Sequence, residues 1–278
     1  MARFLQTLNS NPFLGNLVKT LTLWHTELPV LLESFPFAFA GKLTQVEEMR
    51  LLCDNRLQSL GFHMDDAFLA TMSNFSSISE LVLEGTKFDT FRDFARFTCS
   101  LPSLSSLKCR CLSWSGDDPN VSAFAGVGYG LKLTSLLVRY FPVGLNFYLT
   151  LLFLEVYEVP LIALVPLLYA SGECLQHLTI YISKVPIGME QYLRSIQLKS
   201  LRSLYISVEL IPAIEDRLII PILSHLTSPD IHDIHLLFQA HHTIGVHDSR
   251  FDLPRLAPLT RSVHGPISPT WNVSLYAT

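Results

Sequence analysis

The most regular alternation of apolar and polar positions lies in residues 78–110. Residues 78–83 (ISELVL) alternate as a half-buried strand does, and residues 104–109 (LSSLKC) repeat that pattern. Between them, Thr90–Ser100 has helical periodicity, and both Asp89 and Thr90 are residue types that cap helix N-termini. One side of this helix carries Phe91, Phe94, Phe97, Thr98 and Leu101, whereas the other carries Arg92, Asp93 and Arg96. The segment therefore predicts a strand, an amphipathic helix and a second strand.

The strand pattern, apolar-x-x-apolar-x-apolar, recurs along the chain. Its nine starting residues are Val18, Val46, Ile78, Leu104, Leu133, Leu151, Leu175, Leu201 and Ile231. From residue 18 to residue 231 there are eight intervals of about 27 residues each, inside the 20–29-residue period of leucine-rich repeats. The 18 residues from Leu133 to Leu151 form the shortest interval. Because one such unit cannot bury its apolar faces alone, the spacing predicts an α/β fold. We expect an irregular leucine-rich-repeat solenoid, with a mainly parallel sheet backed by helices and turns.

Segments between the strands have the size of helices or loops. The predicted helices are Ala2–Asn9, Glu27–Phe39, Asp65–Met72, Leu161–Ala170 and Arg217–Leu226. Residues 115–130 are rich in Gly, Asp, Pro and Ser and predict a long exposed loop. The repeat fades after Gln239, so residues 1–239 are predicted to form the repeat domain. Residues 240–278 are predicted to be an irregular C-terminal segment with one last strand at residues 271–277.

Composition narrows the classes of function. Hydrophobic residues make up 49% of the chain and charged residues 16%, which is enough apolar material for a sizeable core. A net charge of -4 argues against a nucleic-acid partner. Five scattered cysteines and a start unlike a secretory signal predict reduced thiols in an intracellular protein, cytoplasmic or nuclear. The longest uncharged apolar run, residues 159–170, is 12 residues long, short of the ~20 that a membrane span needs.

Candidate chemical motifs are weak. His232, His235, His241, His242 and His247 are the densest group of potential zinc ligands. His232 and His235 cannot both point to the outer face of one strand, so exposed loop histidines are the preferred interpretation.

Other motifs lack their partners. Residues 126–130 (GVGYG) resemble a phosphate loop in composition only, and Ser105-x-x-Lys108 lacks its companion motifs. Cys109-x-Cys111 has the wrong spacer for a redox or zinc pair, and Glu155 and Glu158 point oppositely on a strand. No catalytic, cofactor-binding or metal-binding residue is therefore predicted, and the chain is not expected to be an enzyme.

The outward positions of the strands are the remaining candidates for function. In the repeat pattern the third, fifth and seventh positions point to the open face of the sheet. The candidate partner-binding residues there are Lys108, Arg110, Arg139, Phe153, Tyr157, His177, Tyr181 and Tyr205. Exposed Tyr and Phe on adjacent strands favour a protein interface, although such residues can also be partly covered by neighbours.

Four runs carry a resemblance to a known family. They are Arg3–Leu23 (RFLQTLNSNPFLGNLVKTLTL), Phe39–Leu51 (FAGKLTQVEEMRL), Phe75–Trp114 (FSSISELVLEGTKFDTFRDFARFTCSLPSLSSLKCRCLSW) and Gly172–Ile180 (GECLQHLTI). These runs resemble the repeat region of F-box/leucine-rich-repeat-type proteins of basidiomycete fungi. The resemblance covers most of residues 3–238 and implies a substrate-receptor role in a Skp1–cullin–F-box ubiquitin ligase.

The same resemblance implies an F-box, a three-helix element opening with a Leu-Pro-x-Glu-like run, before the repeats. Residues 28–33 (LPVLLE) are similar to that opening, but they lie between two predicted strands and no matching helices follow. We therefore expect a monomer that recognises an unidentified protein on its sheet face and does not bind the Skp1 adaptor by itself. A truncated or non-functional gene product, or an α/β hydrolase lacking a recognisable nucleophile elbow, are the alternatives.

Overall fold

The structure is a computed structural model, and two compact units make it up: Met1–Gly144 and Leu145–Thr278. It describes residues 2–25, 29–53, 64–114, 133–139, 151–157, 168, 171, 173–182, 198–209, 223, 226, 228–240 and 270–277. The predicted loop at residues 115–130 lies outside these residues, as do the predicted helices at 161–170 and 217–226 apart from Leu168, Leu223 and Leu226. Every strand pairing within each unit is parallel, so the chain is α/β with a parallel sheet as predicted.

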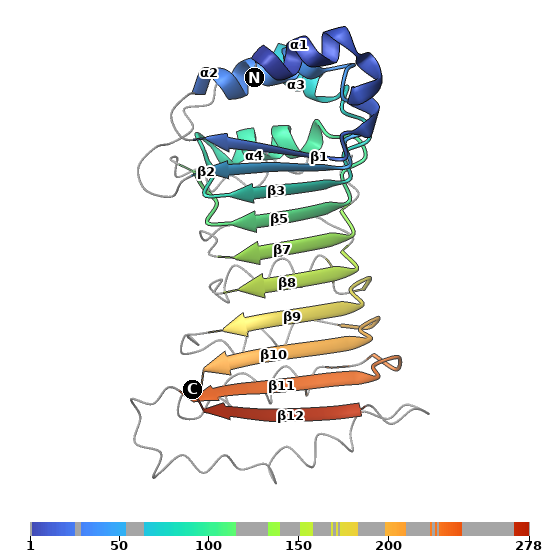
Figure 1. Ribbon diagram of the computed structural model, residues 1–278. Coiled ribbons are helices and arrows are strands. Elements are labelled where there is room, and N and C mark those ends of the chain that lie inside the picture. The colour runs from blue at the N-terminus through green and yellow to red at the C-terminus, as the bar shows by residue number, and fades with distance from the viewer. Residues whose placement is uncertain are drawn as a thin grey trace. The chain divides into compact units, whose positions relative to one another are not determined.

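Within the described residues of the N-terminal unit, five strands of the main sheet lie side by side in the order of the chain (Figure 1). They are β1 (Thr20–His25), β2 (Glu48–Cys53), β3 (Glu80–Glu84), β5 (Ser106–Arg110) and β7 (Ser135–Arg139). A separate pair, β4 (Lys87–Phe88) and β6 (Ser113–Trp114), was not predicted. The helices are α1 (Ala2–Ser10), η1 (Pro12–Leu17), α2 (Pro29–Phe39), α3 (Asp66–Met72) and α4 (Phe91–Cys99). All four predicted α-helices of this unit are therefore confirmed, and the short 3-10 helix η1 is additional.

Side-chain caps set where α3 and α4 begin. The Asp65 carboxylate accepts the backbone N–H of Phe68 at 2.7 Å, and the Thr90 hydroxyl accepts the backbone N–H of Asp93 at 3.1 Å. The apolar side of α4 is buried as its periodicity predicts, since Phe94 is 0% exposed and Phe97 is 1% exposed. Thr90 and not Asp89 is thus the cap, and α4 packs its aromatic side into the core.

Among the described residues of the C-terminal unit, five further parallel strands follow one another in chain order. They are β8 (Phe153–Tyr157), β9 (His177–Ile182), β10 (Ser203–Glu209), β11 (Asp233–Ala240) and β12 (Thr270–Ala277). β12 confirms the predicted last strand and pairs with β11, matching Ile234 to Trp271 in register. The predicted division of the chain at residue 239 stays a prediction.

The repeat pattern describes the core well but misplaces the strand starts. Eight of the nine predicted starting residues are buried, from Val46 to Ile231, whereas Val18 is only half-buried. Each strand begins about two residues later than predicted, because the first apolar position belongs to the turn before the strand: Ile78 precedes β3 and Leu104 precedes β5.

A backbone motif also recurs before the strands. One carbonyl accepts two successive N–H groups of the following repeat, as Ser79 accepts those of Ser105 and Ser106 at 2.9 Å each. In the C-terminal unit, Gln176 accepts those of Arg202 and Ser203 at 2.7 and 3.0 Å. The same local geometry therefore stacks successive repeats within each unit.

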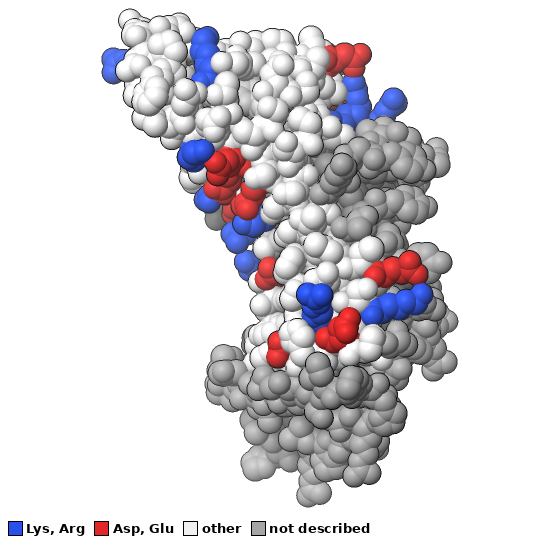
Figure 2. Space-filling model, turned by 90° about the vertical axis from the view of Figure 1, so that its right-hand side faces the viewer, with Lys and Arg blue, Asp and Glu red and all other residues white. Residues whose placement is uncertain are grey.

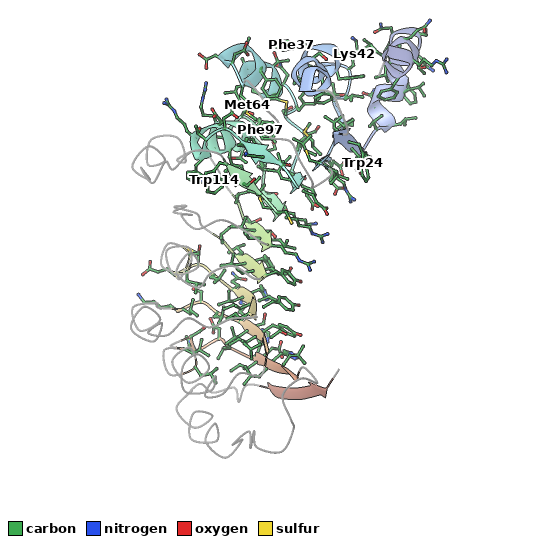
Figure 3. The ribbon with its side chains drawn as sticks, turned by 90° about the vertical axis from the view of Figure 1, so that its left-hand side faces the viewer. Trp24, Phe37, Lys42, Met64, Phe97 and Trp114 are labelled. Carbon is green, nitrogen blue, oxygen red and sulfur yellow. The ribbon has the colours of Figure 1, made fainter. Side chains whose placement is uncertain are left out.

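The sheet of the N-terminal unit has a covered face and an open face. In β3, Leu81 and Leu83 are fully buried, while Glu80, Val82 and Glu84 are half-buried on the opposite side. Figure 3 shows Trp24 of β1 projecting from the other side of the sheet than Phe97 of α4. The covered face therefore forms the core with α4, and the open face is lined by the outward strand positions.

Candidate interaction surface on the sheet

The open face of the C-terminal unit carries aromatic and histidine side chains in register. Parallel pairing sets Phe153 beside His177, Tyr157 beside Tyr181, and Tyr205 beside His235. We call these six residues the aromatic face. Five of them were named from the sequence as partner-binding candidates, and His235 was considered only as a metal ligand. Its place as the fifth residue of the repeat that starts at Ile231 is the signal that would have identified it.

The rings of the aromatic face stack on one another. Tyr157 and Tyr181 have ring centroids 3.9 Å apart and planes 7° apart, and Phe153 and His177 are stacked at 4.4 Å and 4°. Tyr205 lies two residues out of register with Tyr181, and its ring makes a tilted contact with that of Tyr181 at 5.5 Å. Its centroid is 6.2 Å from that of His235. The three tyrosines therefore lie on three neighbouring strands, within two or three strand spacings of one another, as the sequence predicts.

These side chains are neither core nor fully exposed. Phe153 is 47% exposed, whereas the others are half-buried beside their strand neighbours. By contrast, the inward-pointing residues of the same strands, such as Leu154 and Ile180, are 1% exposed. The stacked rings thus form an accessible apolar surface beside, and not inside, the core.

Glu155 is an acidic residue on the same open side of the sheet as the aromatic face. Tyr157 donates its hydroxyl hydrogen to the Glu155 carboxylate. Burial raises the pKa of the Tyr157 phenol, and the adjoining carboxylate raises it further because it stabilises the protonated hydroxyl. The Tyr157 ring is therefore held both by its stacking partner and by this hydrogen bond.

A serine, a histidine and an aspartate lie in one row of the face without forming a catalytic triad. His177 Nδ1 lies 2.7 Å from Ser203 Oγ, and Ser203 is in register with Asp233. The Asp233 carboxylate, however, lies 2.8 Å from His232 Nδ1, so it contacts a histidine other than His177. Burial lowers the pKa of His177, and the charge of Arg202 lowers it further.

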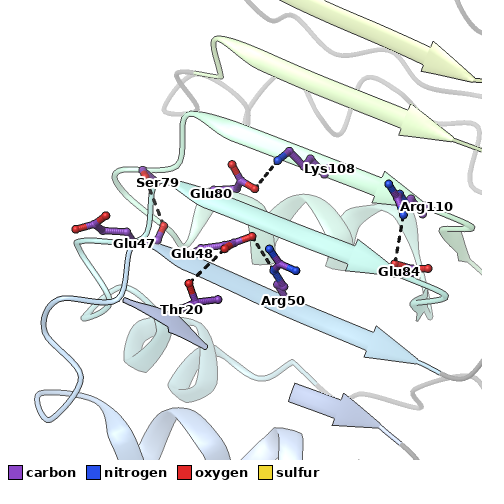
Figure 4. A network of polar contacts seen from close by, with 9 residues as sticks. All are labelled: Thr20, Glu47, Glu48, Arg50, Ser79, Glu80, Glu84, Lys108 and Arg110. Carbon is purple, nitrogen blue, oxygen red and sulfur yellow. Dashed lines mark hydrogen bonds and ion pairs between the residues drawn. The ribbon is translucent and has the colours of Figure 1, made fainter. Parts of the chain in front are cut away.

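The open face of the N-terminal unit is ionic. Lys108 Nζ lies 2.6 Å from Glu80 Oε1, and Arg110 Nη1 lies 3.9 Å from Glu84 Oε2 (Figure 4). Arg50 Nε donates to Glu48 Oε1 at 2.7 Å and thereby lowers the pKa of the Glu48 carboxyl. We call the residues Glu48, Arg50, Glu80, Glu84, Lys108 and Arg110 the ionic face.

Arg139 of β7 is in register with Arg110, so the third basic candidate belongs to the same row of strand positions. The structure therefore brings the basic candidates together on the N-terminal unit and the aromatic candidates together on the C-terminal unit.

Charged side chains elsewhere are also interleaved. On the side of the molecule seen in Figure 2, the blue atoms of Lys and Arg lie beside the red atoms of Asp and Glu on the described surface. Two ion pairs outside the ionic face join Lys19 to Glu47 at 2.6 Å and Lys199 to Glu173 at 3.0 Å. The described part of this side thus lacks the basic stripe of a nucleic-acid interface.

The residues of the weaker sequence motifs have structural partners. The Ser105 hydroxyl donates to the Ser79 carbonyl at 3.2 Å, and Lys108 pairs with Glu80. Burial raises the pKa of the Cys109 thiol, which is 1% exposed. Within the described residues, no group of three His, Cys, Asp or Glu side chains is placed to hold a metal; His241, His242, His247 and Glu158 lie outside them.

Comparison with protein-family models and with curated proteins finds no match to this chain. Among the described helices, none combines the length and the apolar character needed to cross a membrane.

Proposed function

We propose that this chain is a protein-recognition module that binds its partner on the aromatic face. The carrying observation is the stacked pair Tyr157–Tyr181 on the open side of a parallel sheet, continued by Tyr205. Tyrosine supplies a large contact area with few rotatable bonds, and interface energy is concentrated in a few such aromatic residues. Because neighbouring rings already restrict these side chains, little conformational entropy is lost when a partner covers them.

We further propose that the repeats form an irregular leucine-rich-repeat solenoid. Support comes from the recurring buried first apolar residue and from the recurring carbonyl that accepts two N–H groups within each unit. Repeat proteins commonly bind partners on their extended sheet surface. Together with the resemblance to F-box/leucine-rich-repeat-type proteins, this favours a role like that of a substrate receptor of an F-box ubiquitin ligase.

Photo-crosslinking at the most exposed ring of the face tests the proposal. Benzoylphenylalanine replaces Phe153 in the full chain, which is irradiated in a basidiomycete cell extract, and the adducts are identified by mass spectrometry. We expect a small set of adducts that disappear when Tyr157, Tyr181 and Tyr205 are all changed to alanine. At ~2 kcal/mol or more for each anchor, the triple change should weaken binding by far more than 100-fold.

Two controls separate recognition from folding. Trp24→Ala removes a 70% exposed aromatic residue from the open face of the other unit and should leave the adducts unchanged. The melting temperature of the triple-alanine variant should fall by only a few degrees, because the rings lie outside the core. An unfolded triple variant, or adducts that persist in it, would refute the proposal.

A further inference from the structure

The acidic group of the aromatic face has no cationic partner among the residues that the structure describes. Glu155 accepts from the Tyr157 hydroxyl, and no Lys or Arg is described within ion-pair distance of it. Moreover, the outward register positions described in β8–β11 hold no Lys or Arg: these positions are 153, 155, 157, 177, 179, 181, 203, 205, 207, 233, 235 and 237. Asp233 adds a second acid in the row that contains His177 and Ser203.

The ionic face of the N-terminal unit shows the opposite arrangement. There, Glu80 is paired with Lys108 and Glu84 with Arg110, on strands adjacent in the sheet. Glu48 is paired with Arg50 of its own strand. Acids on that face are therefore paired within the chain, whereas Glu155 has no such pair among the residues that the structure describes.

We infer that the aromatic face binds an extended polypeptide segment that presents arginine side chains. This inference rests on the proposed function and names the class of its partner. A guanidinium group stacks on tyrosine rings and donates through a planar fork to a carboxylate. Glu155 lies beside Thr179 and two positions before Tyr157, so one arginine can contact both the carboxylate and the neighbouring rings.

The spacing of the rings sets the form of the segment. Tyr157 and Tyr181 share one register row, whereas Tyr205 lies beside Thr179 in the row of Glu155. Because strands are about 4.8 Å apart, this row from Glu155 to Tyr205 covers about 10 Å. An extended chain rises ~3.3 Å per residue and directs alternate side chains to one side, about 6.6 Å apart. A segment with arginine at alternate positions therefore places two guanidinium groups over this row, one near Glu155 and one near Tyr205.

Arginine is preferred to lysine because of its shape. A lysine ammonium is a compact, strongly hydrated charge that cannot stack on a ring and fork to a carboxylate at the same time. Its attraction to Glu155 is therefore retained, but the planar contact with the tyrosine rings is lost. A comparison of arginine with lysine therefore tests the inference, because plain electrostatic attraction to a chain of net charge -4 would favour the two side chains equally.

Binding of three labelled peptides to the full chain tests the inference. The probe is fluorescein-labelled Arg-Gly-Arg-Gly-Arg-Gly, compared by fluorescence anisotropy with its lysine and citrulline analogues. Citrulline keeps the planar shape of arginine but has no charge. We expect the lysine analogue to bind about fivefold more weakly and the citrulline analogue about tenfold more weakly than the arginine peptide.

Two matched variants place the binding site. Glu155→Gln should weaken arginine-peptide binding about fivefold, whereas Glu84→Gln removes the same charge from the ionic face and should change it less than about twofold. Tyr181→Leu, which keeps an apolar side chain but no ring, should also weaken binding, and circular dichroism checks that each variant is folded. Equal affinities for the arginine and citrulline peptides, equal effects of the two glutamate variants, or no binding of any peptide would each overturn the inference.

The two proposals fail in different ways. If the peptides do not bind while crosslinks from position 153 still depend on the tyrosines, the aromatic face recognises a protein of another chemistry. If the crosslinks are absent as well, recognition on this face is itself wrong.

Discussion

Removal of the Phe94 ring should be one of the most destabilising single changes in the N-terminal unit. Phe94 is 0% exposed in the middle of α4, and its ring lies 5.5 Å from that of Phe88 and 6.0 Å from that of Phe91. Phe94→Ala leaves a cavity in this aromatic cluster because neighbouring backbone can close it only partly. The loss of the edge-on contact with Phe88 adds to the loss of burial.

The expected loss in the free energy of unfolding is about 3–5 kcal/mol. A domain is commonly stable by only ~5–15 kcal/mol, so this is a large share of the total. Phe94→Leu keeps much of the apolar volume and should cost about half as much. Arg92→Ala, on the exposed side of the same helix, should stay within about 0.5 kcal/mol.

Trp114 is a suitable reporter for this measurement. Its ring centroid lies 5.0 Å from that of Phe91, so its fluorescence reports on the packing of α4. Urea denaturation would be followed in a background that carries Trp24→Phe and Trp271→Phe, with circular dichroism as a second probe. A loss below about 1 kcal/mol for Phe94→Ala would show that α4 does not pack as the structure describes.

Two further predictions concern backbone strain and pH. Cys111 has a φ of 52°, and the residue at the equivalent position of the preceding repeat is Gly85, with a φ of 64°. Because glycine adopts this conformation without strain, Cys111→Gly should raise the free energy of unfolding by about 0.5–1 kcal/mol, and an unchanged or lower urea midpoint would contradict this. Burial lowers the pKa of His177 in the folded chain below the ordinary histidine pKa of 6.5. As the pH falls through 6.5, the unfolded chain therefore takes up a proton at this residue before the folded chain does. This histidine therefore contributes to a fall in stability between neutral pH and its lower folded pKa, and His177→Gln should make that fall smaller; an identical pH dependence of the urea midpoint would count against it.

The sequence predicts the core better than the element boundaries. The apolar positions of the repeat are recognisable because burial selects residues such as Ile78, Leu104 and Leu201 at a regular spacing, and all three are buried. The strands start later than predicted because the first apolar residue is held in the turn before each strand. The β4–β6 pair was missed because two-residue strands such as Lys87–Phe88 have no measurable periodicity.

The candidate surface follows from the sequence only in part. Period-two alternation correctly places Tyr157, Tyr181 and Tyr205 on one face, since register between successive repeats is set by the buried rows. The hydrogen bond from Tyr157 to Glu155 and the pairing of Lys108 with Glu80 depend on side-chain rotamers, which no alternation pattern encodes. Sequence reasoning therefore finds the residues of a face but not which of them form hydrogen bonds or ion pairs with one another.

The ionic face and the aromatic face differ in whether their side chains are already paired with one another, and this difference affects how well each face can bind a partner. On the ionic face, cross-strand pairs such as Lys108–Glu80 already occupy the charged groups, and a ligand would have to break these pairs before it gained its own contacts. On the aromatic face, the stacked rings are already ordered, yet Phe153 still exposes 47% of its surface, and Glu155 has no Lys or Arg partner among the described residues. The aromatic face is therefore the surface on which binding energy can accumulate, and an arginine-bearing segment is the ligand whose chemistry matches both its rings and its acid.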